Sequence, residues 1–335
     1  MTPVGDGTRG PSITPTDAPP RSRRVTPRRL GAGIALAVVA LTAVLAVSLL
    51  AGAGPPAIPA SPGSDPILVG AGDIARKPPG RRGLDEETAK ILDAMVETYP
   101  GRVTVMMLGD GAYDDGTTVE FANYYEPTWG RHKGITRPVP GNHEYHDPAA
   151  SGYFSYFGAA AGDPGEGYYA YDLGAWRIYA LNSHVDHGAG SPQDVWLRQD
   201  LAAHRDTACV LAYWHFARFS SGPHGDVEGL DAFWEALTAA GADVVVVAHD
   251  HNYQRFAPLL ADGTRSDAVG IRQFLVGTGG ASLNSFDTIR EHTEASSTDT
   301  HGVLMLTLHD SSYDFQFVPI AGRTYTDVGT DIACH

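Results

Sequence analysis

The sequence predicts an α/β protein in which two mixed β-sheets pack face to face with helices outside, a four-layer α-β-β-α sandwich. Apolar runs alternate with helical periodicity early in residues 66–335, and strands dominate late. No second linker interrupts these roughly 270 residues, a length that suits one α/β domain. One open, doubly wound sheet is the alternative.

The expected elements follow from local patterns. Strands are expected in apolar runs that end in glycine or polar residues: Pro66–Asp73, Val103–Gly109, two within Tyr168–Asn182, Cys209–Trp214, Asp243–Ala248, Gln273–Val276, Val303–Leu308 and Ser312–Val318. Helices are expected over Leu84–Tyr99 and around Leu230–Leu237, where apolar residues share one face. A third helix is expected after Ser191, which can cap it, with Pro192 in the first turn.

The first 64 residues differ in composition from the rest. Residues 1–29 are rich in Pro, Thr, Gly and Arg, which is typical of a disordered tail. Residues 30–53 form an uncharged run, long enough for a bilayer span of about 20 residues. The arginines before this run place the tail in the cytoplasm. A Pro-rich linker, residues 54–65, leads to the domain of residues 66–335.

We therefore expect an extracytoplasmic domain, held at the cell membrane by a signal anchor or secreted after cleavage of a signal peptide. The small residues Ala51–Ala53 would suit cleavage, whereas the apolar run exceeds the usual core of about 7–15 residues. Export favours a disulfide between the only two cysteines, Cys209 and Cys334. A buried free Cys209 is the alternative.

The charge of the chain excludes one class of partner. Residues 1–64 carry six Arg and two Asp, and the remainder holds 18 basic and 37 acidic residues, a net charge of −19. So acidic a body repels phosphate backbones, and we expect no nucleic-acid partner. The oligomeric state does not follow from the composition.

Five apolar runs are each followed at once by polar residues able to bind metal. The five clusters are Gly72-Asp73, Gly109-Asp110-Gly111-Ala112-Tyr113, Gly141-Asn142-His143-Glu144, Trp214-His215 and His249-Asp250-His251. Any one of them is a common turn or a core histidine. Together they supply carboxylates, a phenol, an amide and imidazoles at the carboxyl ends of strands, where ligands gather in α/β sheets. These groups suit two hard or borderline cations, which can clamp a phosphoryl group during in-line displacement.

In order and spacing, the clusters resemble those of the calcineurin-like metallophosphoesterases, in particular the purple acid phosphatase-like branch. The resemblance extends over about Pro66–Val318 and implies the four-layer fold of that superfamily. It implies two metal ions bridged by Asp110. The implied ligands are Asp73, Asp110, Tyr113 and His251 for the first metal, and Asp110, Asn142, His215 and His249 for the second.

Tyr113 discriminates between branches of the superfamily. The other branch has a metal-binding His where this chain has Ala75, so that Tyr113 takes the place of this ligand. A phenolate favours a hard trivalent ion, and the resemblance implies Fe(III) at this site with Zn, Mn or Fe at the second. The alternative is a loop tyrosine packed on Trp129 or a neighbour.

The resemblance also implies catalytic roles. His143 would face the phosphate without binding metal, and a hydroxide held by the metals would be the nucleophile. His224, in a Gly-rich loop close to His215, is a second catalytic candidate, which would touch substrate or protonate the leaving oxygen; a solvated loop histidine is equally compatible.

The expected function is therefore hydrolysis of small phosphate esters, foremost monoesters, as in acid phosphatases. The alternatives are a phosphodiesterase, or a nucleotide or phospholipid hydrolase, with the same metals. A cell-surface metal-binding protein with low turnover is the alternative from another class. Nothing in the sequence determines the size of the substrate pocket.

Overall fold

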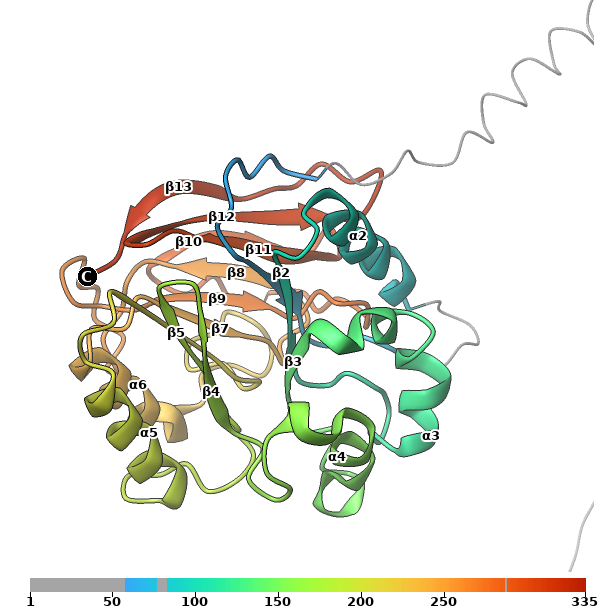
Figure 1. Cartoon of the computed structure of the whole chain (residues 1–335), viewed down its shortest axis with the longest axis horizontal. Helices are drawn as coiled ribbons and strands as arrows, with labels where there is room; N and C mark the ends of the chain where they lie inside the picture. The colour runs from blue at the N-terminus through green and yellow to red at the C-terminus, as the bar shows by residue number, and fades with distance from the viewer. Residues whose placement is uncertain (1–57, 77–82, 287) are drawn as a thin grey trace, which may run out of the picture. The chain divides into compact units, whose positions relative to one another are not determined.

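The computed structural model describes residues 58–76, 83–286 and 288–335 (Figure 1). The predicted tail, the predicted membrane segment and residues 54–57 of the linker lie outside these ranges. Within them, no helix is both long and apolar enough to cross a bilayer.

Two mixed β-sheets form the centre of the described chain. The first has the order β13 (Val328–Ala333), β12 (Ser312–Pro319), β11 (Gly302–Leu308), β1 (Ile67–Ala71), β2 (Val103–Leu108) and β3 (Thr136–Val139). The second has the order β10 (Thr293–Ser297), β8 (Tyr253–Phe256), β9 (Arg272–Val276), β7 (Val244–Val247), β6 (Cys209–Tyr213), β5 (Trp176–Ala180) and β4 (Tyr169–Leu173).

Helices cover both outer faces. They are α2 (Asp85–Thr98), α3 (Thr118–Glu120), α4 (Ser151–Phe157), α5 (Pro192–Ala203) and α6 (Asp231–Ala239), with short 3-10 and π segments between them. Figure 1 shows α5 and α6 together on one side of the sheets and α2, α3 and α4 on the other. As expected, Ser191 caps α5: its hydroxyl accepts the Asp194 N–H at 3.2 Å, and Pro192 occupies the first turn.

Successive side chains along the strands of the second sheet point to opposite faces, and they divide the core into two clusters. Leu211, Val244 and Val246 pack into the cluster between the sheets, which also takes in β1, β2, β11 and β12. Their neighbours Ala212 and Val245 belong to a second cluster, with the apolar faces of α5 and α6. A sheet buried on both faces requires this pattern. The four-layer expectation is thus confirmed, and the doubly wound alternative is wrong.

The two cysteines pair, as expected. Cys209, at the start of β6, is bonded to Cys334, just after β13, with their Cα atoms 5.5 Å apart. The bridge joins the second sheet to the edge strand of the first.

Four strands have no counterpart among the expected elements: β3, β8, β10 and β13. Three of them, β3, β10 and β13, lie at sheet edges, where burial imposes little apolar alternation. β3 even contains Pro138, which an edge strand tolerates because proline need not donate to a ladder. The expectation that Ser312–Val318 is the last strand is wrong, because β13 pairs with it.

Candidate metal centre

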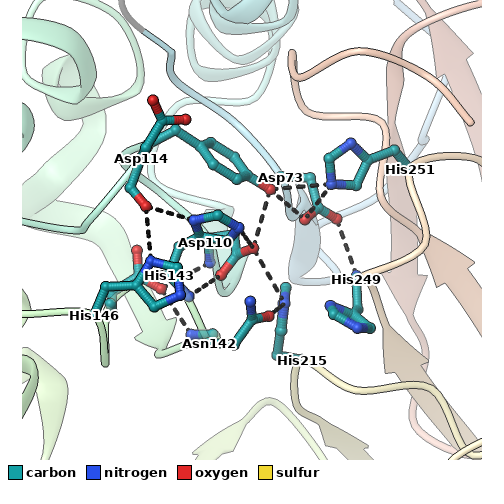
Figure 2. Close-up of polar contacts among 12 residues, drawn as sticks. Asp73, Asp110, Asp114, Asn142, His143, His146, His215, His249 and His251 are labelled. Carbon is teal, nitrogen blue, oxygen red and sulfur yellow. Dashed lines mark hydrogen bonds and ion pairs between the residues drawn. The ribbon is translucent and has the colours of Figure 1, made fainter. Parts of the chain in front are cut away.

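Strand topology gathers the five polar clusters at one place. β1, β2 and β3 run parallel in the first sheet, as do β6 and β7 in the second. Asp73, Asp110, Asn142, His215 and His249 each follow one of these strands within three residues. Figure 2 shows their side chains, with that of His251, pointing toward one another.

Several of these residues hold unusual backbone conformations. Asp73, Asp110 and His249 have φ values of 60°, 51° and 72°, in the left-handed region that residues other than glycine rarely adopt. Such conformations persist where the surrounding structure imposes them, and they gather at functional sites. Here each one turns the chain sharply after a strand and directs the side chain toward the centre.

Tyr113 lies at the middle of the first donor group. Its phenol oxygen is 2.8 Å from Asp73 Oδ1, 3.0 Å from Asp110 Oδ2 and 3.1 Å from His251 Nε2. His251 Nε2 is in turn 3.3 Å from Asp73 Oδ1. The hydroxyl of this turn residue therefore lies among the predicted ligands of the first metal, while its ring packs on that of His143, with the ring centroids 4.4 Å apart.

The second donor group shares Asp110 with the first. Asp110 Oδ2 is 3.4 Å from His215 Nε2, which is 3.1 Å from Asn142 Oδ1. His249 offers a ring nitrogen within 4.8 Å of the ligand atoms of Asp110 and His215. All seven predicted metal ligands thus come together, four around each of two adjoining positions.

Backbone carbonyls orient two of the imidazoles. His215 Nδ1 lies 2.7 Å from the Leu108 carbonyl, and His251 Nδ1 lies 2.8 Å from that of Ser282. A carbonyl oxygen can only accept a hydrogen bond, so each Nδ1 carries a proton. The Nε2 atom of each ring is therefore the one that can bind a metal at the centre. Hydrogen bonds of this kind hold metal-binding histidines in place.

The buried charges are balanced against one another. Burial would raise the pKa of Asp110, but the charge and hydrogen bond of His215 outweigh it and hold the pKa well below its usual range. Burial would lower the pKa of His215, yet Asp110 raises it to about 9, and Asp73 does the same for His251. Burial and the charge of His215 lower the pKa of His249 to about 3, so that this ligand is neutral.

The donor set fits a pair of cations. Burial and then the charges of Asp110 and Asp73 raise the pKa of Tyr113 above its usual value. A cation among these oxygens would reverse that effect, since bound ions are often the largest local charge in a site. Carboxylates suit hard cations, and imidazole suits Zn, Cu and Fe.

His143 lies beside the donor groups. Its Nε2 is 3.8 Å from Asp110 Oδ2, and its side chain is 26% exposed. Its backbone N–H donates to Asp110 Oδ1 at 3.0 Å, and its Nδ1 donates to the Asp114 carbonyl at 2.5 Å. His143 thus lies beside the carboxylate that the two donor groups share and remains partly exposed. Asp114 and Asp115 themselves are exposed.

His224 reaches the second donor group from the loop after β6. Its ring is exposed and lies 4.2 Å, centroid to centroid, from that of His249. This position suits a group that contacts substrate.

Glu144 is a site residue whose role the sequence reasoning missed. Its fully buried carboxylate accepts N–H groups from Asp110 at 2.8 Å, Gly111 at 2.9 Å and Gly141 at 2.7 Å. It thereby joins the loops after β2 and β3. Its place in the third cluster was the only signal. Gly277 also belongs to the site, because a Cβ on it would lie 2.7 Å from Asp73 Oδ2.

The fold and the buried donor set define a metallophosphoesterase domain. The profile of the family described as Calcineurin-like phosphoesterase matches residues 68–253, more than half of the chain, and the chain belongs to this family. Two curated relatives from Arabidopsis thaliana agree with the purple acid phosphatase-like branch. "Purple acid phosphatase 15" is 26% identical over 212 residues, 52% of this chain and 40% of the relative. "Probable purple acid phosphatase 20" is 26% identical over 187 residues, 48% of this chain and 43% of the relative.

The chain therefore spans less than half the length of these curated relatives. Among solved structures, purple acid phosphatase PPD1 from yellow lupin seeds has a TM-score of 0.66 at 16% identity, over 81% of this chain and 54% of that one. GAP50, "the anchor in the inner membrane complex of Plasmodium", has a TM-score of 0.62 at 15% identity, over 82% of this chain and 90% of that one. These two likenesses show the fold alone.

Proposed function

We propose that this protein hydrolyses phosphate monoesters with two bound metal ions, in the manner of an acid phosphatase. One observation carries the proposal: a single carboxylate oxygen is shared by both donor groups. Asp110 Oδ2 lies 3.0 Å from Tyr113 Oη on one side and 3.4 Å from His215 Nε2 on the other. Two-metal hydrolases need such a bridge, because their metals sit about 3.5–4 Å apart.

The side chains divide into two ligand sets. The first comprises Asp73, Asp110, Tyr113 and His251, and the second comprises Asp110, Asn142, His215 and His249. We assign Fe(III) to the first set, because it contains the phenol, and Zn, Mn or Fe to the second. Bound metals would activate a water molecule for attack and neutralise the phosphoryl oxygens.

Two histidines act on the substrate directly. The Asp114 carbonyl fixes the proton of His143 on Nδ1, so Nε2 is the atom directed at the centre, where it would contact a phosphoryl oxygen. His224 lies against His249, where it would meet the leaving oxygen.

A substrate panel tests the proposal. The metal-loaded full chain should hydrolyse p-nitrophenyl phosphate faster than bis-p-nitrophenyl phosphate or pyrophosphate, and Asp110→Asn and His143→Ala should each reduce kcat/KM by about 100-fold or more. His146→Ala is the matched control. His146 also bonds the Asp114 carbonyl, but its side chain is 49% exposed. The kcat/KM of the His146→Ala variant should therefore remain near that of the wild type.

Two outcomes would change the conclusion. A wild type no faster than the Asp110→Asn and His143→Ala variants would refute catalysis and favour a metal-binding protein. Hydrolysis of the diester or of pyrophosphate in preference to the monoester would replace the proposed substrate class.

The visible absorption spectrum, with metal analysis on the same sample, tests the metal assignment. A broad visible band that disappears in Tyr113→Phe but persists in Tyr145→Phe, with about two metals per chain, is the expected result. A colourless protein with two Zn or Mn ions would keep the phosphoesterase and remove the iron.

We also propose that the domain works outside the cytoplasm, anchored by residues 30–53 or released after cleavage. The Cys209–Cys334 disulfide supports an oxidising compartment. The test is protease digestion of intact cells, together with the mass of the mature chain. Protection of the domain until the cells are lysed would refute export.

A further inference from the structure

A buried carboxylate sits between two of the metal ligands and is absent from both ligand sets. Asp250 lies between His249 and His251 in sequence and is 1% exposed. Its Oδ2 accepts the Ser220 hydroxyl, and its Oδ1 accepts the His224 N–H at 3.1 Å. Both partners belong to the loop after β6 that carries His224.

The loop is folded tightly around this carboxylate. Ser220 Oγ, which donates to Asp250, also accepts the Gly222 N–H at 2.9 Å and a hydrogen of Gln254 Nε2 at 3.2 Å. A Cβ on Gly222 would overlap the Asp250 carboxylate, its distance to Oδ2 being only 2.7 Å. Glycine is therefore required where the loop passes over Asp250.

Other anchors hold the two ends of the loop. Asp226 pairs with Arg290 at the far end, and two glutamines hold the start. Gln273 bonds both the N–H and the C=O of Phe219, at 3.2 and 2.6 Å, and Gln254 Oε1 accepts the Ser221 N–H at 2.8 Å. Beyond Ser221, the side-chain acceptor that reaches His224 among the described residues is Asp250.

We propose that Asp250 is a positioning residue that holds His224 against the metal ligand His249. This inference rests on the proposed phosphoesterase function. The ring centroids of His224 and His249 are 4.2 Å apart. Asp250, the next residue after His249, accepts a hydrogen bond from the backbone N–H of His224. The ligand segment and the substrate-contacting loop therefore move as one unit, and the effect of Asp250 on turnover passes through His224.

Two substitutions break this link from opposite sides. Asparagine at position 250 keeps one acceptor oxygen and replaces the other with an N–H₂ group, which faces a Ser220 oxygen that already accepts two hydrogens. Ser220→Ala removes the hydroxyl that Asp250 accepts and changes no residue of the segment His249–His251. Residues that orient a site in this way typically change activity by about 10–100-fold.

A double-mutant cycle on the metal-loaded full chain is the kinetic test. We expect Asp250→Asn and Ser220→Ala each to lower kcat/KM for p-nitrophenyl phosphate by about ten-fold, with two metals retained per chain. In a His224→Ala background, the same substitutions should have almost no effect. Additive effects, or loss of a metal in Asp250→Asn, would overturn the proposal, since Asp250 would then act on the ligands themselves.

Amide hydrogen exchange on the metal-free protein supplies a readout that does not depend on activity. Residues 222–225 should lose protection in Asp250→Asn, whereas β6 and β7 should not. Asp243→Asn is the matched control: its buried carboxylate, like that of Asp250, accepts two hydrogen bonds, here from the backbone N–H groups of Val210 at 2.8 Å and His335 at 2.7 Å. It should leave the exchange of residues 222–225 and the kcat/KM unchanged.

The two proposals can fail separately. An inactive wild type in which Asp250→Asn still exposes residues 222–225 refutes the phosphoesterase function and leaves the structural link standing. An active wild type that matches Asp250→Asn and Ser220→Ala in kcat/KM and in exchange refutes the role of Asp250.

Discussion

Gly109 lies where the loops after β2 and β3 come closest, and Gly109→Ala tests how tightly the metal centre is packed. Its φ is +82°, and a Cβ at this position would lie 2.6 Å from His215 Nδ1 and 2.7 Å from Gly141 N. Ordinary contacts of a Cβ begin near 3.4 Å. One obstacle is backbone and the other is a predicted metal ligand held by the Leu108 carbonyl, so neither can yield freely.

The cost has two parts. A non-glycine residue in a sparsely populated backbone region costs about 1–3 kcal/mol. Overpacking a core by one methyl group adds about 1–3 kcal/mol. The free energy of unfolding should therefore fall by about 2–6 kcal/mol. At about 2–4 °C per kcal/mol for a large domain, Tm should fall by roughly 4–24 °C.

Thermal unfolding and metal analysis of the purified variant are the assays. Because the new methyl group displaces the His215 ring, we expect about one metal per chain in place of two, together with the lower Tm. Gly134→Ala is the control, since a Cβ there meets no atom within 4 Å and its φ is ordinary. A Gly109→Ala variant with the Tm and metal content of Gly134→Ala would refute the packing argument.

Three further predictions follow from the same structure. Glu144→Ala leaves three buried N–H groups without an acceptor and should cost about 3 kcal/mol in urea unfolding. The N–H partners of Glu120 are exposed at Asp114 and Asp115 and half-buried at Thr117, so Glu120→Ala should cost under about 1 kcal/mol, and equal costs would contradict the reasoning. Cys334→Ser opens a crosslink that spans 125 residues and should lower stability by about 4 kcal/mol with kcat/KM unchanged, which scanning calorimetry and turnover would check. In the metal-free protein, Asp110 and Asp73 raise the pKa of His215 and His251 to about 9, so the stability that these residues contribute is complete below about pH 6.5 and is lost as the pH rises through 9. The urea midpoint of the metal-free protein should fall over that window and that of the metal-loaded protein should not, since bound metals keep these ligands deprotonated; parallel curves would refute the assignment.

The central strands were predictable because burial on both faces leaves an unambiguous apolar run. Val244–Val247 is a continuous run of valines, and it forms β7 as expected. Three of the four edge strands, β3, β10 and β13, were not expected, because a strand with one free edge and an exposed face need not be apolar. The fourth, β4, was expected, and β8 was missed although it lies inside its sheet. β13, with the sequence VGTDIA, is recognisable only through its pairing with β12.

The seven predicted metal ligands could be found for a related reason. Six of them lie directly after a central strand or within three residues of another predicted ligand, and Asn142 follows the edge strand β3, so the order of the clusters along the chain carried the information. The roles of Glu144 and Asp250, which bind the backbone of loops at the site, were not recognised from the sequence. Glu144 and Asp250 act through backbone N–H groups of loops distant in sequence, and no spacing rule reports such partners.

The sequence by itself determined the fold class, the family resemblance and the identity of the seven donor side chains, because strand periodicity and polar clusters at strand ends are local patterns. Only the tertiary structure decided how closely Tyr113 and His215 approach Asp110, and that His224 lies against His249. These facts depend on distances between segments that are far apart along the chain. Such distances are set by the packing of two sheets and by turns with positive φ, which local sequence patterns do not encode.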